Sequence, residues 1–253
     1  MSERFIDRVV VVTGAAAGLG RALARGFARE GAHLVLLDID ETNLAETAEI
    51  LKKDGATCST HRVDLADEAA IKAFGARICA EHPQIHVLCN NAGIAYGEVT
   101  QNFDTTAQEK WLRYFAVNTI APLTLAQALR PSLKAAQGAI VNQSSMAGYA
   151  PATPYGVTKA ALNAVTYGMA HFFGADGVRV NAIAPGIMET PANRAQLTPE
   201  TYARIQAMQV LQRHGDSDDI VHLAMFLASD EARFITCEVV SCDAGNRIRG
   251  WRY

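Results

Sequence analysis

The sequence lacks long apolar runs and an excess of basic residues. No uninterrupted apolar stretch approaches the ~18 residues that suggest a membrane span. The first eight residues carry four charged side chains and not the apolar core of a signal peptide. With 23 Lys and Arg against 26 Asp and Glu, the formal net charge is −3. A surface that binds nucleic acid or acidic lipid needs the opposite balance. We therefore expect a cytoplasmic protein with no membrane or nucleic-acid partner.

Cysteine pairs and metal-ligand motifs are also missing. The five cysteines are odd in number and scattered, and no two of them form a C-x-x-C motif. The seven histidines form no recognised metal-binding motif. We therefore expect reduced thiols and no metal site.

What the sequence does have is a regular alternation of short apolar runs and longer amphipathic stretches. The first run, residues 9–12, is four valines, which suit a parallel strand buried on both faces. Further runs are residues 34–37, 87–89, 139–141, 178–183 and 239–240, and helix-like stretches are residues 19–30, 41–53, 67–81, 106–135, 155–175 and 216–228. This alternation predicts an α/β fold over 1–253, a single-domain doubly wound Rossmann-like parallel sheet with helices on both faces. Such sheets bind ligands where their strands end, so functional residues should follow the apolar runs.

A glycine-rich loop, T-G-A-A-A-G-L-G over residues 13–20, follows the first run. Its glycines permit a tight turn and a close approach of the backbone to a pyrophosphate. A helix starting near Gly18 points free N–H groups and its positive dipole end at the same place. Gly14, Gly18, Leu19 and Gly20 are therefore candidate cofactor-binding residues, although a purely structural glycine-rich loop is the alternative.

Asp38 ends the second run, where the acid that binds the adenosine ribose is expected. Its carboxylate can accept both ribose hydroxyls and would repel the extra phosphate of NADP. Asp40 adds negative charge, and no Arg or Lys lies in the glycine loop or directly after Asp38. The alternative is a turn residue at the end of a strand, but the pattern favours NAD.

The spacing T-G-x-x-x-G-x-G resembles the short-chain dehydrogenase/reductase family and not the usual Rossmann G-x-G-x-x-G. Ordered motifs along the whole chain carry the resemblance: residues 13–20, Asn90-Asn91-Ala92-Gly93, Asn118, Ser145, Tyr155-x-x-x-Lys159, and Pro185-Gly186 with Thr190. The resemblance implies a nicotinamide dinucleotide cofactor and a homotetramer. It assigns to that cofactor Asp64 and Leu65 at the adenine edge, Asn91, Ala92 and Gly93 under the adenosine ribose, and Pro185, Gly186, Met188 and Thr190 around the nicotinamide carboxamide.

Tyr155 and Lys159 are four residues apart in a helical stretch, which places both on one helix face. A tyrosine stacked on a lysine stem is the structural alternative. A free tyrosine has a pKa of about 10 and is a poor base at neutral pH, whereas a nearby ammonium favours its phenolate form. The pair therefore predicts general acid/base catalysis. Ser145 follows the run 139–141 and would hold the substrate oxygen. The resemblance implies that Lys159 also hydrogen-bonds to the nicotinamide ribose. It implies that Asn118 holds a water molecule of the proton relay behind Lys159.

Two places depart from the family pattern. The interval from Ser145 to Tyr155 is a few residues short, so the loop is either trimmed or takes a tighter path through Pro151 and Pro154. Asp243-Ala244-Gly245 stands where the family usually shows two glycines. We expect the C-terminal tail 246–253, which mixes basic and aromatic residues, to pack at a subunit interface or to complete a neighbouring subunit's pocket.

These features predict an NAD-dependent oxidoreductase that interconverts a secondary alcohol and a ketone, with Tyr155 as the acid/base. The alternatives are an NADP-linked carbonyl reductase and a non-catalytic protein that senses the dinucleotide. The intact set of Asn118, Ser145, Tyr155 and Lys159 argues against the sensor. The expected substrate loop, about 188–213, has no decisive pattern, and the small-molecule substrate we expect is a cyclic or aromatic alcohol or a polyol.

Overall fold

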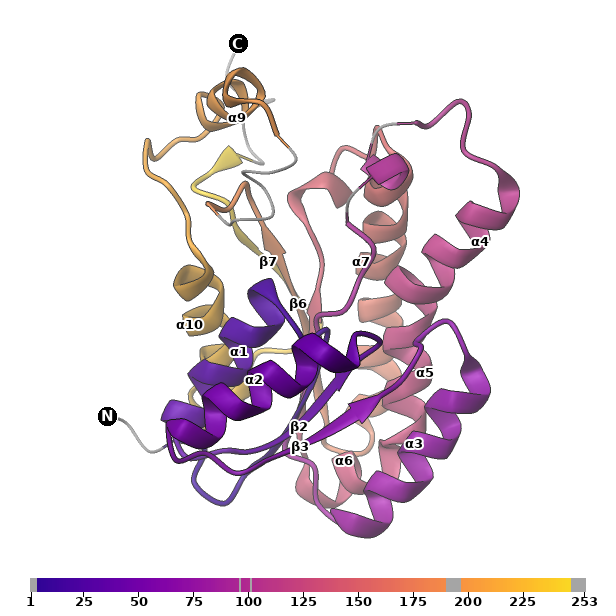
Figure 1. The fold of residues 1–253 in the computed structure, drawn as a ribbon, viewed down its shortest axis with the longest axis vertical. Helices are drawn as coiled ribbons and strands as arrows, with labels where there is room; N and C mark the ends of the chain where they lie inside the picture. The colour runs from indigo at the N-terminus through magenta and orange to yellow at the C-terminus, as the bar shows by residue number, and fades with distance from the viewer. Residues whose placement is uncertain (1–3, 96, 101, 190–196, 247–253) are drawn as a thin grey trace.

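The computed structural model describes residues 4–95, 97–100, 102–189 and 197–246. Thr190 and the tail from residue 247 onward lie outside the described residues, as does part of the expected substrate loop. Within the described ranges, seven parallel strands form one sheet in the order β3-β2-β1-β4-β5-β6-β7 (Figure 1). The strands are β1 (Val9–Thr13), β2 (His33–Asp38), β3 (Cys58–Arg62), β4 (Val87–Asn90), β5 (Ala139–Gln143), β6 (Arg179–Pro185) and β7 (Val239–Cys242).

Helices cover both faces of this sheet. Helices α1 (Gly18–Arg29), α2 (Glu41–Lys53) and α10 (Ser217–Ala228) contribute buried side chains to the core on one face. Helices α3 (Glu68–Glu81), α5 (Ala121–Ala128) and α7 (Pro154–Gly174) contribute to the core on the other face. The remaining α-helices in the described part are α4 (Gln108–Phe115), α6 (Arg130–Ala136) and α9 (Pro199–Gln206). The predicted doubly wound α/β domain is therefore confirmed.

β1 shows why the sheet needs a helical layer on each side. Val10 and Val12 belong to the core on one face and Val11 to the core on the other. Successive side chains of a strand point to opposite faces, and all three valines are fully buried. Burying a valine removes it from water at a gain of ~1.5–3 kcal/mol, so an all-valine strand is stable only with both faces covered.

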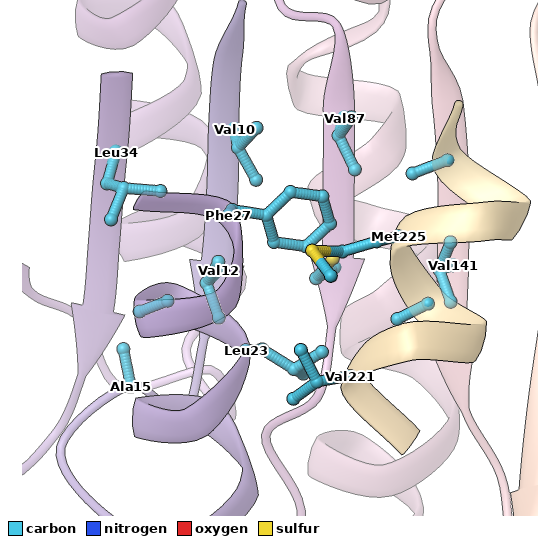
Figure 2. Packing of buried hydrophobic residues seen from close by; sticks show 14 of the residues in the cluster. Val10, Val12, Ala15, Leu23, Phe27, Leu34, Val87, Val141, Val221 and Met225 are labelled. Carbon is cyan, nitrogen blue, oxygen red and sulfur yellow. The ribbon is translucent and has the colours of Figure 1, made fainter. Parts of the chain in front are cut away.

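In the core on the first face, α1 packs directly against α10. Figure 2 shows Phe27 of α1 lying over the strands near Val87, with Met225 of α10 beside its ring. An ideal Cβ on Gly26 would lie 2.3 Å from Val221 Cγ1. The two helices therefore pack with no space for a side chain at Gly26, and this contact sets the position of α1 and of the loop before it.

Two segments differ from the sequence prediction. β3 was not expected, because Cys-Ser-Thr-His-Arg is not an apolar run; it is an edge strand that pairs only with β2 and is half-buried. The stretch 106–135 is not continuous but is divided into α4, a π-helical turn (Ala116–Ile120), α5 and α6. Pro122 and Pro131 lie in the first turns of α5 and α6, where a missing N–H breaks no helical hydrogen bond.

The order of the strands places a crevice between the ends of β1 and β4, since the chain moves outward from β1 in one direction and from β4 in the other. Thr13 ties the two ends together. Its hydroxyl oxygen accepts hydrogen bonds from the backbone N–H groups of Asn91 and Ala92, at 3.0 and 2.9 Å. The Asn91 side chain in turn donates to the Thr13 carbonyl at 3.0 Å. The glycine loop and the N-N-A-G turn therefore form one rigid edge.

Candidate active site

A cavity of about 860 Å³ lies along the carboxyl ends of the strands. This volume is at the upper end of the range of ligand pockets, ~300–1,000 Å³. Almost every predicted site residue that the structure describes lines it: Gly14, Gly18, Leu19, Gly20, Asp38, Asp64, Leu65, Asn91, Ala92, Gly93, Ser145, Tyr155, Lys159, Pro185, Gly186 and Met188. Asn118 is the exception, and its side chain lies behind the wall.

The glycine loop has the shape of a cradle. Gly14 and Gly18 have left-handed backbone conformations, with φ of 67° and 53°. An ideal Cβ on Gly20 would lie 1.9 Å from the Gly14 carbonyl oxygen, so the loop closes on itself there. An ideal Cβ on Gly18 would meet no atom within 4 Å, so the space beside Gly18 is open. The loop therefore fits a pyrophosphate lying against the N-terminus of α1.

Asp38 holds this loop as well as facing the cavity. One oxygen of its carboxylate accepts from the Ala16 N–H at 2.9 Å, and the other accepts from the Asp40 N–H at 3.0 Å. Arg21, the first cation after the glycine loop, points elsewhere. It donates to the Ala16 carbonyl at 2.7 Å and to the Thr47 hydroxyl at 2.8 Å, and it pairs with Glu46 on α2. Arg21 does not line the cavity.

At the same end of the cavity as Asp38, beyond β3, the structure adds a residue that the sequence did not indicate. Arg113 of α4 lines the cavity with its guanidinium 3.6 Å from the carboxylate of Asp64. The other carboxylate oxygen of Asp64 accepts from the Ala66 N–H at 2.9 Å. Arg113 is 49 positions beyond Asp64, and no local motif marks it, so only the folded chain shows this pairing.

Tyr155 and Lys159 lie in the first turns of α7, which Thr153 caps by accepting from the Gly156 N–H at 3.1 Å. Tyr155 is partly exposed to the cavity, whereas Lys159 is only 3% exposed. The Lys159 ammonium lies 5.7 Å from the centre of the Tyr155 ring and donates to the Gln143 carbonyl at 2.6 Å. Burial lowers the pKa of Lys159 from 10.5 to about 8. The cavity therefore contains an amine that can change charge just above neutral pH.

Asn118 lies in the π-helical turn, a kind of irregularity that is frequent at functional sites. Its amide donates to the Ile94 carbonyl at 3.0 Å and to the Thr158 hydroxyl at 3.1 Å, and it accepts from the Ile94 N–H at 2.7 Å. These bonds join the end of β4 to α7 beside Lys159. Gly93 lies in the same corner, where an ideal Cβ would be 3.5 Å from the Lys159 ammonium.

Ser145 follows β5 and lines the cavity together with Tyr155. Its hydroxyl accepts from the Ala147 N–H at 3.2 Å and begins a single 3-10 turn (Met146–Gly148). An ideal Cβ on Gly148 would lie 3.0 Å from the carbonyl carbon of Lys159, so this turn rests directly on the backbone of α7. The short interval before Tyr155 is therefore a loop that follows a tight path.

Most of the other described residues that line the cavity are apolar. They include Ile94 and Ala95 after β4, Met146 and Ala147 after Ser145, Ile187 after β6, Leu197 just before α9 and Ile205 within α9. None of these belongs to a motif, because an apolar residue in a loop gives no signal in the sequence that distinguishes a pocket wall from ordinary packing. Next to them, Met188 pairs with Gly215 in an isolated β-bridge.

The matched family model is described as enoyl-(acyl carrier protein) reductase and spans residues 14–247. The chain is a short-chain dehydrogenase/reductase. This dehydrogenase/reductase is 36% identical to cis-4-hydroxycyclohexanecarboxylate dehydrogenase of Sinomonas cyclohexanicum, over 97% of this chain and 98% of that enzyme. It is 34% identical to 2,5-dichloro-2,5-cyclohexadiene-1,4-diol dehydrogenase of Sphingobium indicum, again over 97% and 98% of the two chains. The protein is therefore an oxidoreductase with relatives that are dehydrogenases of ring alcohols.

Solved structures of the same family hold both kinds of nicotinamide dinucleotide. L-sorbose reductase of Gluconobacter frateurii, solved with NADPH and L-sorbose, superposes with a TM-score of 0.87 at 28% identity, over 98% of this chain and 99% of that one. A 3-oxoacyl-(acyl-carrier protein) reductase of Brucella melitensis with bound NAD superposes with a TM-score of 0.86 at 31% identity, over 97% and 93% of the two chains. The family thus binds nicotinamide dinucleotides, and its fold is compatible with either one.

Proposed function

We propose that this dehydrogenase/reductase uses NAD to interconvert a small apolar secondary alcohol, preferably a ring alcohol, and its ketone. One observation carries the proposal. A single cavity contains the glycine loop with Asp38 at one end and Ser145, Tyr155 and Lys159 at the other. A non-catalytic sensor needs only the first of these ends.

The chain's own residues supply the proton chemistry. In the direction of alcohol oxidation, the Tyr155 oxygen takes the proton of the substrate hydroxyl, while Ser145 donates a hydrogen bond that orients the substrate oxygen. The nearby Lys159 ammonium stabilises the negative charge of a Tyr155 phenolate. NAD, when bound, supplies the acceptor for the hydride. Asn118 keeps the backbone after β4 and the start of α7 in register, so that Lys159 stays beside Tyr155.

Charge at the adenosine end supports NAD over NADP. Asp38 faces the cavity with a carboxylate that would repel a 2′-phosphate. Arg21, the first cation after the glycine loop in the sequence, already has its guanidinium bonded to Ala16, Thr47 and Glu46. A phosphate at this position would therefore meet a carboxylate and no available guanidinium from the glycine loop or the start of α1.

The wall at the substrate end supports an apolar ring. Ala95, Met146, Ala147, Leu197 and Ile205 line the same cavity as Ser145, and all five belong to segments that follow β4, β5 or β6 and not β2 or β3. A polyol would leave several hydroxyl groups without partners against this described wall, and each lost hydrogen bond to a buried polar group costs ~1–3 kcal/mol. A cyclohexanol-sized ring buries its carbon atoms there and presents one hydroxyl to Tyr155. The two ring-alcohol relatives agree with this choice.

A panel of secondary alcohols with NAD or NADP, followed by the absorbance of the reduced coenzyme, tests the proposal. We expect the highest kcat/KM with NAD and an unsubstituted or alkyl-substituted cyclohexanol, and a much lower value with a polyol such as sorbitol. Tyr155→Phe keeps the ring and removes the hydroxyl, and should lower kcat by at least ~10²-fold while the variant still binds NAD. Near-normal turnover in that variant, or a preference for polyols, would contradict the proposal.

Exposed apolar side chains support the homotetramer that the resemblance implies. Leu112, Ile120 and Phe172, on the helical elements from α4 to α7, are 63%, 53% and 52% exposed. Phe234, after α10, is 99% exposed. Large apolar side chains on neighbouring elements of a surface are typical of protein–protein contacts, and α7 contacts both α4 and the π-helical turn. We infer that the region from α4 to α7 forms a subunit interface and that Phe234 contributes to a second one.

A further inference from the structure

The turn that follows β7, Asp243–Asn246, contacts two functional segments at once. On one side it packs against the segment after β6, where an ideal Cβ on Gly186 would lie 2.7 Å from Asp243 Cα. The Gly186 N–H also donates to the Cys242 carbonyl at 2.9 Å. The turn's second neighbour is α9, drawn in orange in Figure 1, with the yellow segment of β7 next to it.

On this second side the turn is bonded to the chain that follows α9. The Ala244 carbonyl accepts from the N–H groups of Val210 and Leu211, at 2.7 and 3.0 Å. The Asn246 side chain donates to the Ile205 carbonyl at 3.1 Å, and Asn246 is only 9% exposed. Ile205 is one of the apolar residues that line the cavity, and its bond to the turn after β7 puts it on the side of β5 and β6, away from Asp38.

The turn Asp243–Asn246 has a well-defined backbone conformation. Ala244 and Gly245 both have left-handed conformations, with φ of 52° and 80°, and the Asp243 carboxylate accepts from the Gly245 N–H at 3.0 Å. An ideal Cβ on Gly245 would lie 2.4 Å from Val210 Cγ2. The turn and the chain after α9 are therefore joined by backbone hydrogen bonds and by a close contact of Gly245 with the Val210 side chain, which leaves little freedom for one to move without the other.

We propose that the turn Asp243–Asn246 is a clamp that positions the substrate wall, and that Asn246 is the positioning residue for Ile205. The turn is a part of the chain that no cofactor or catalytic motif includes. α9 has no fully buried residue, and its Tyr202 stacks on His214 of the segment that follows the helix. Its bonds to the turn fix Ile205 relative to the segment of Gly186, and hence the width of the substrate end of the cavity.

The proposal rests on the proposed function only for the identity of the substrate that the wall contacts. Its test therefore has one readout that needs no substrate and one that does. The variant is Asn246→Asp, which keeps the shape and replaces the N–H donor toward Ile205 by a carboxylate oxygen. The matched control is Gln84→Glu, which makes the same chemical change at an amide that donates to the Ala135 carbonyl, outside the peptide measured, and does not line the cavity. Hydrogen exchange of the peptide 198–210 should become faster in Asn246→Asp than in the control.

The second readout is steady-state kinetics with the best ring alcohol of the panel. Asn246→Asp should raise KM by about 5- to 10-fold, the effect of one lost hydrogen bond, with kcat and the Kd of NAD nearly unchanged. Ile205→Ala should also raise KM. If Asn246 acts by positioning Ile205, adding Asn246→Asp to Ile205→Ala should change KM little further.

Three outcomes would overturn the proposal. Unchanged exchange of 198–210 in Asn246→Asp would show that the turn does not hold α9. Faster exchange with unchanged KM would show that the held segment is not a substrate wall. Equal effects of Asn246→Asp in the wild-type and Ile205→Ala backgrounds would show that Asn246 acts elsewhere. If the wild type oxidises no alcohol, the proposed function fails, while the exchange experiment still decides whether the clamp exists.

Discussion

Replacing Lys159 by methionine should make this enzyme inactive and, at neutral pH, more stable. Lys159 is almost completely buried, and its ammonium has one hydrogen bond, to the Gln143 carbonyl. Methionine has a similar length and no charge, so the variant removes the cost of keeping a cation out of water. The variant also removes the ammonium that, in the proposed mechanism, stabilises the Tyr155 phenolate.

The size of the effect follows from the pKa of Lys159, which burial lowers from 10.5 to about 8. At ~1.4 kcal/mol for each pH unit, this difference means that folding disfavours the ammonium by ~3 kcal/mol at pH 7. Against this gain, the Gln143 carbonyl loses its donor, which costs ~1–3 kcal/mol. The net result is a gain of ~1 kcal/mol in the free energy of unfolding, or a rise in Tm of roughly 2–4 °C for a domain of this size.

The gain should depend on pH in a defined direction. Below pH 8 the lysine is protonated in both the folded and the unfolded protein, so the full cost of burial is present. Between pH 8 and 10.5 the folded protein has released the proton and the unfolded chain still binds it, so the wild type becomes more stable as the pH rises. The advantage of Lys159→Met should therefore decrease above pH 8 and reverse before pH 10.5.

Urea unfolding at pH 7, 8, 9 and 10, followed by intrinsic fluorescence at a fixed protein concentration, measures this difference. Lys72→Met is the control, because Lys72 is 67% exposed and forms a surface pair with Glu68. The control should change stability by less than ~1 kcal/mol at every pH. If Lys159→Met destabilises the protein by the same amount at pH 7 and pH 10, the burial of the ammonium does not carry the cost that we assign to it.

Three further predictions concern the coenzyme, the backbone and the assembly. Asp38→Ala should weaken the binding of NAD and lower the ratio of kcat/KM for NAD to kcat/KM for NADP. A wild type that prefers NADP would show that Asp38 does not select the coenzyme without a ribose phosphate. Ala244→Gly should raise the free energy of unfolding by about 0.5 kcal/mol. It removes the cost of a left-handed alanine, ~1–2 kcal/mol, but glycine also gives the unfolded chain more conformational entropy, which cancels part of this gain. Ala152→Gly, in an exposed loop without a positive φ, should instead lower stability, and equal losses in both variants would refute the strain at Ala244. Light scattering at micromolar concentration should give a tetramer, and a monomer would contradict the proposed interfaces.

Local patterns in the sequence determined the fold class and most of the cavity. A parallel strand buried on both faces must be apolar along its length, so the runs that become β1, β2, β4, β5 and β6 are visible without a structure. β7 is an edge strand, and its two valines make it visible as well. β3 was missed because an edge strand has a solvated side and tolerates Ser, Thr, His and Arg. All strands of a parallel sheet end at the same edge, so the glycine loop, Asp38, Ser145 and the helix of Tyr155 were bound to meet there.

No helix in the described part of the chain combines the length and apolar character needed to cross a membrane. The sequence carries this information directly, because a span of that kind is a contiguous run. A contiguous apolar run involves only neighbouring residues, so the sequence shows it without a structure.

Tertiary structure alone decided the properties that depend on which distant residues meet. Arg21 is bonded to α2 and does not line the cavity, because Thr47 lies 26 positions away on a helix packed beside it. Lys159 has a lowered pKa because α7 is covered by other parts of the chain, and a lysine in a sequence does not show how deeply it will be buried. Asn246 reaches Ile205 across 41 positions. Contacts of this kind come from the packing of whole elements, for which the order of residues in one segment has no local signature.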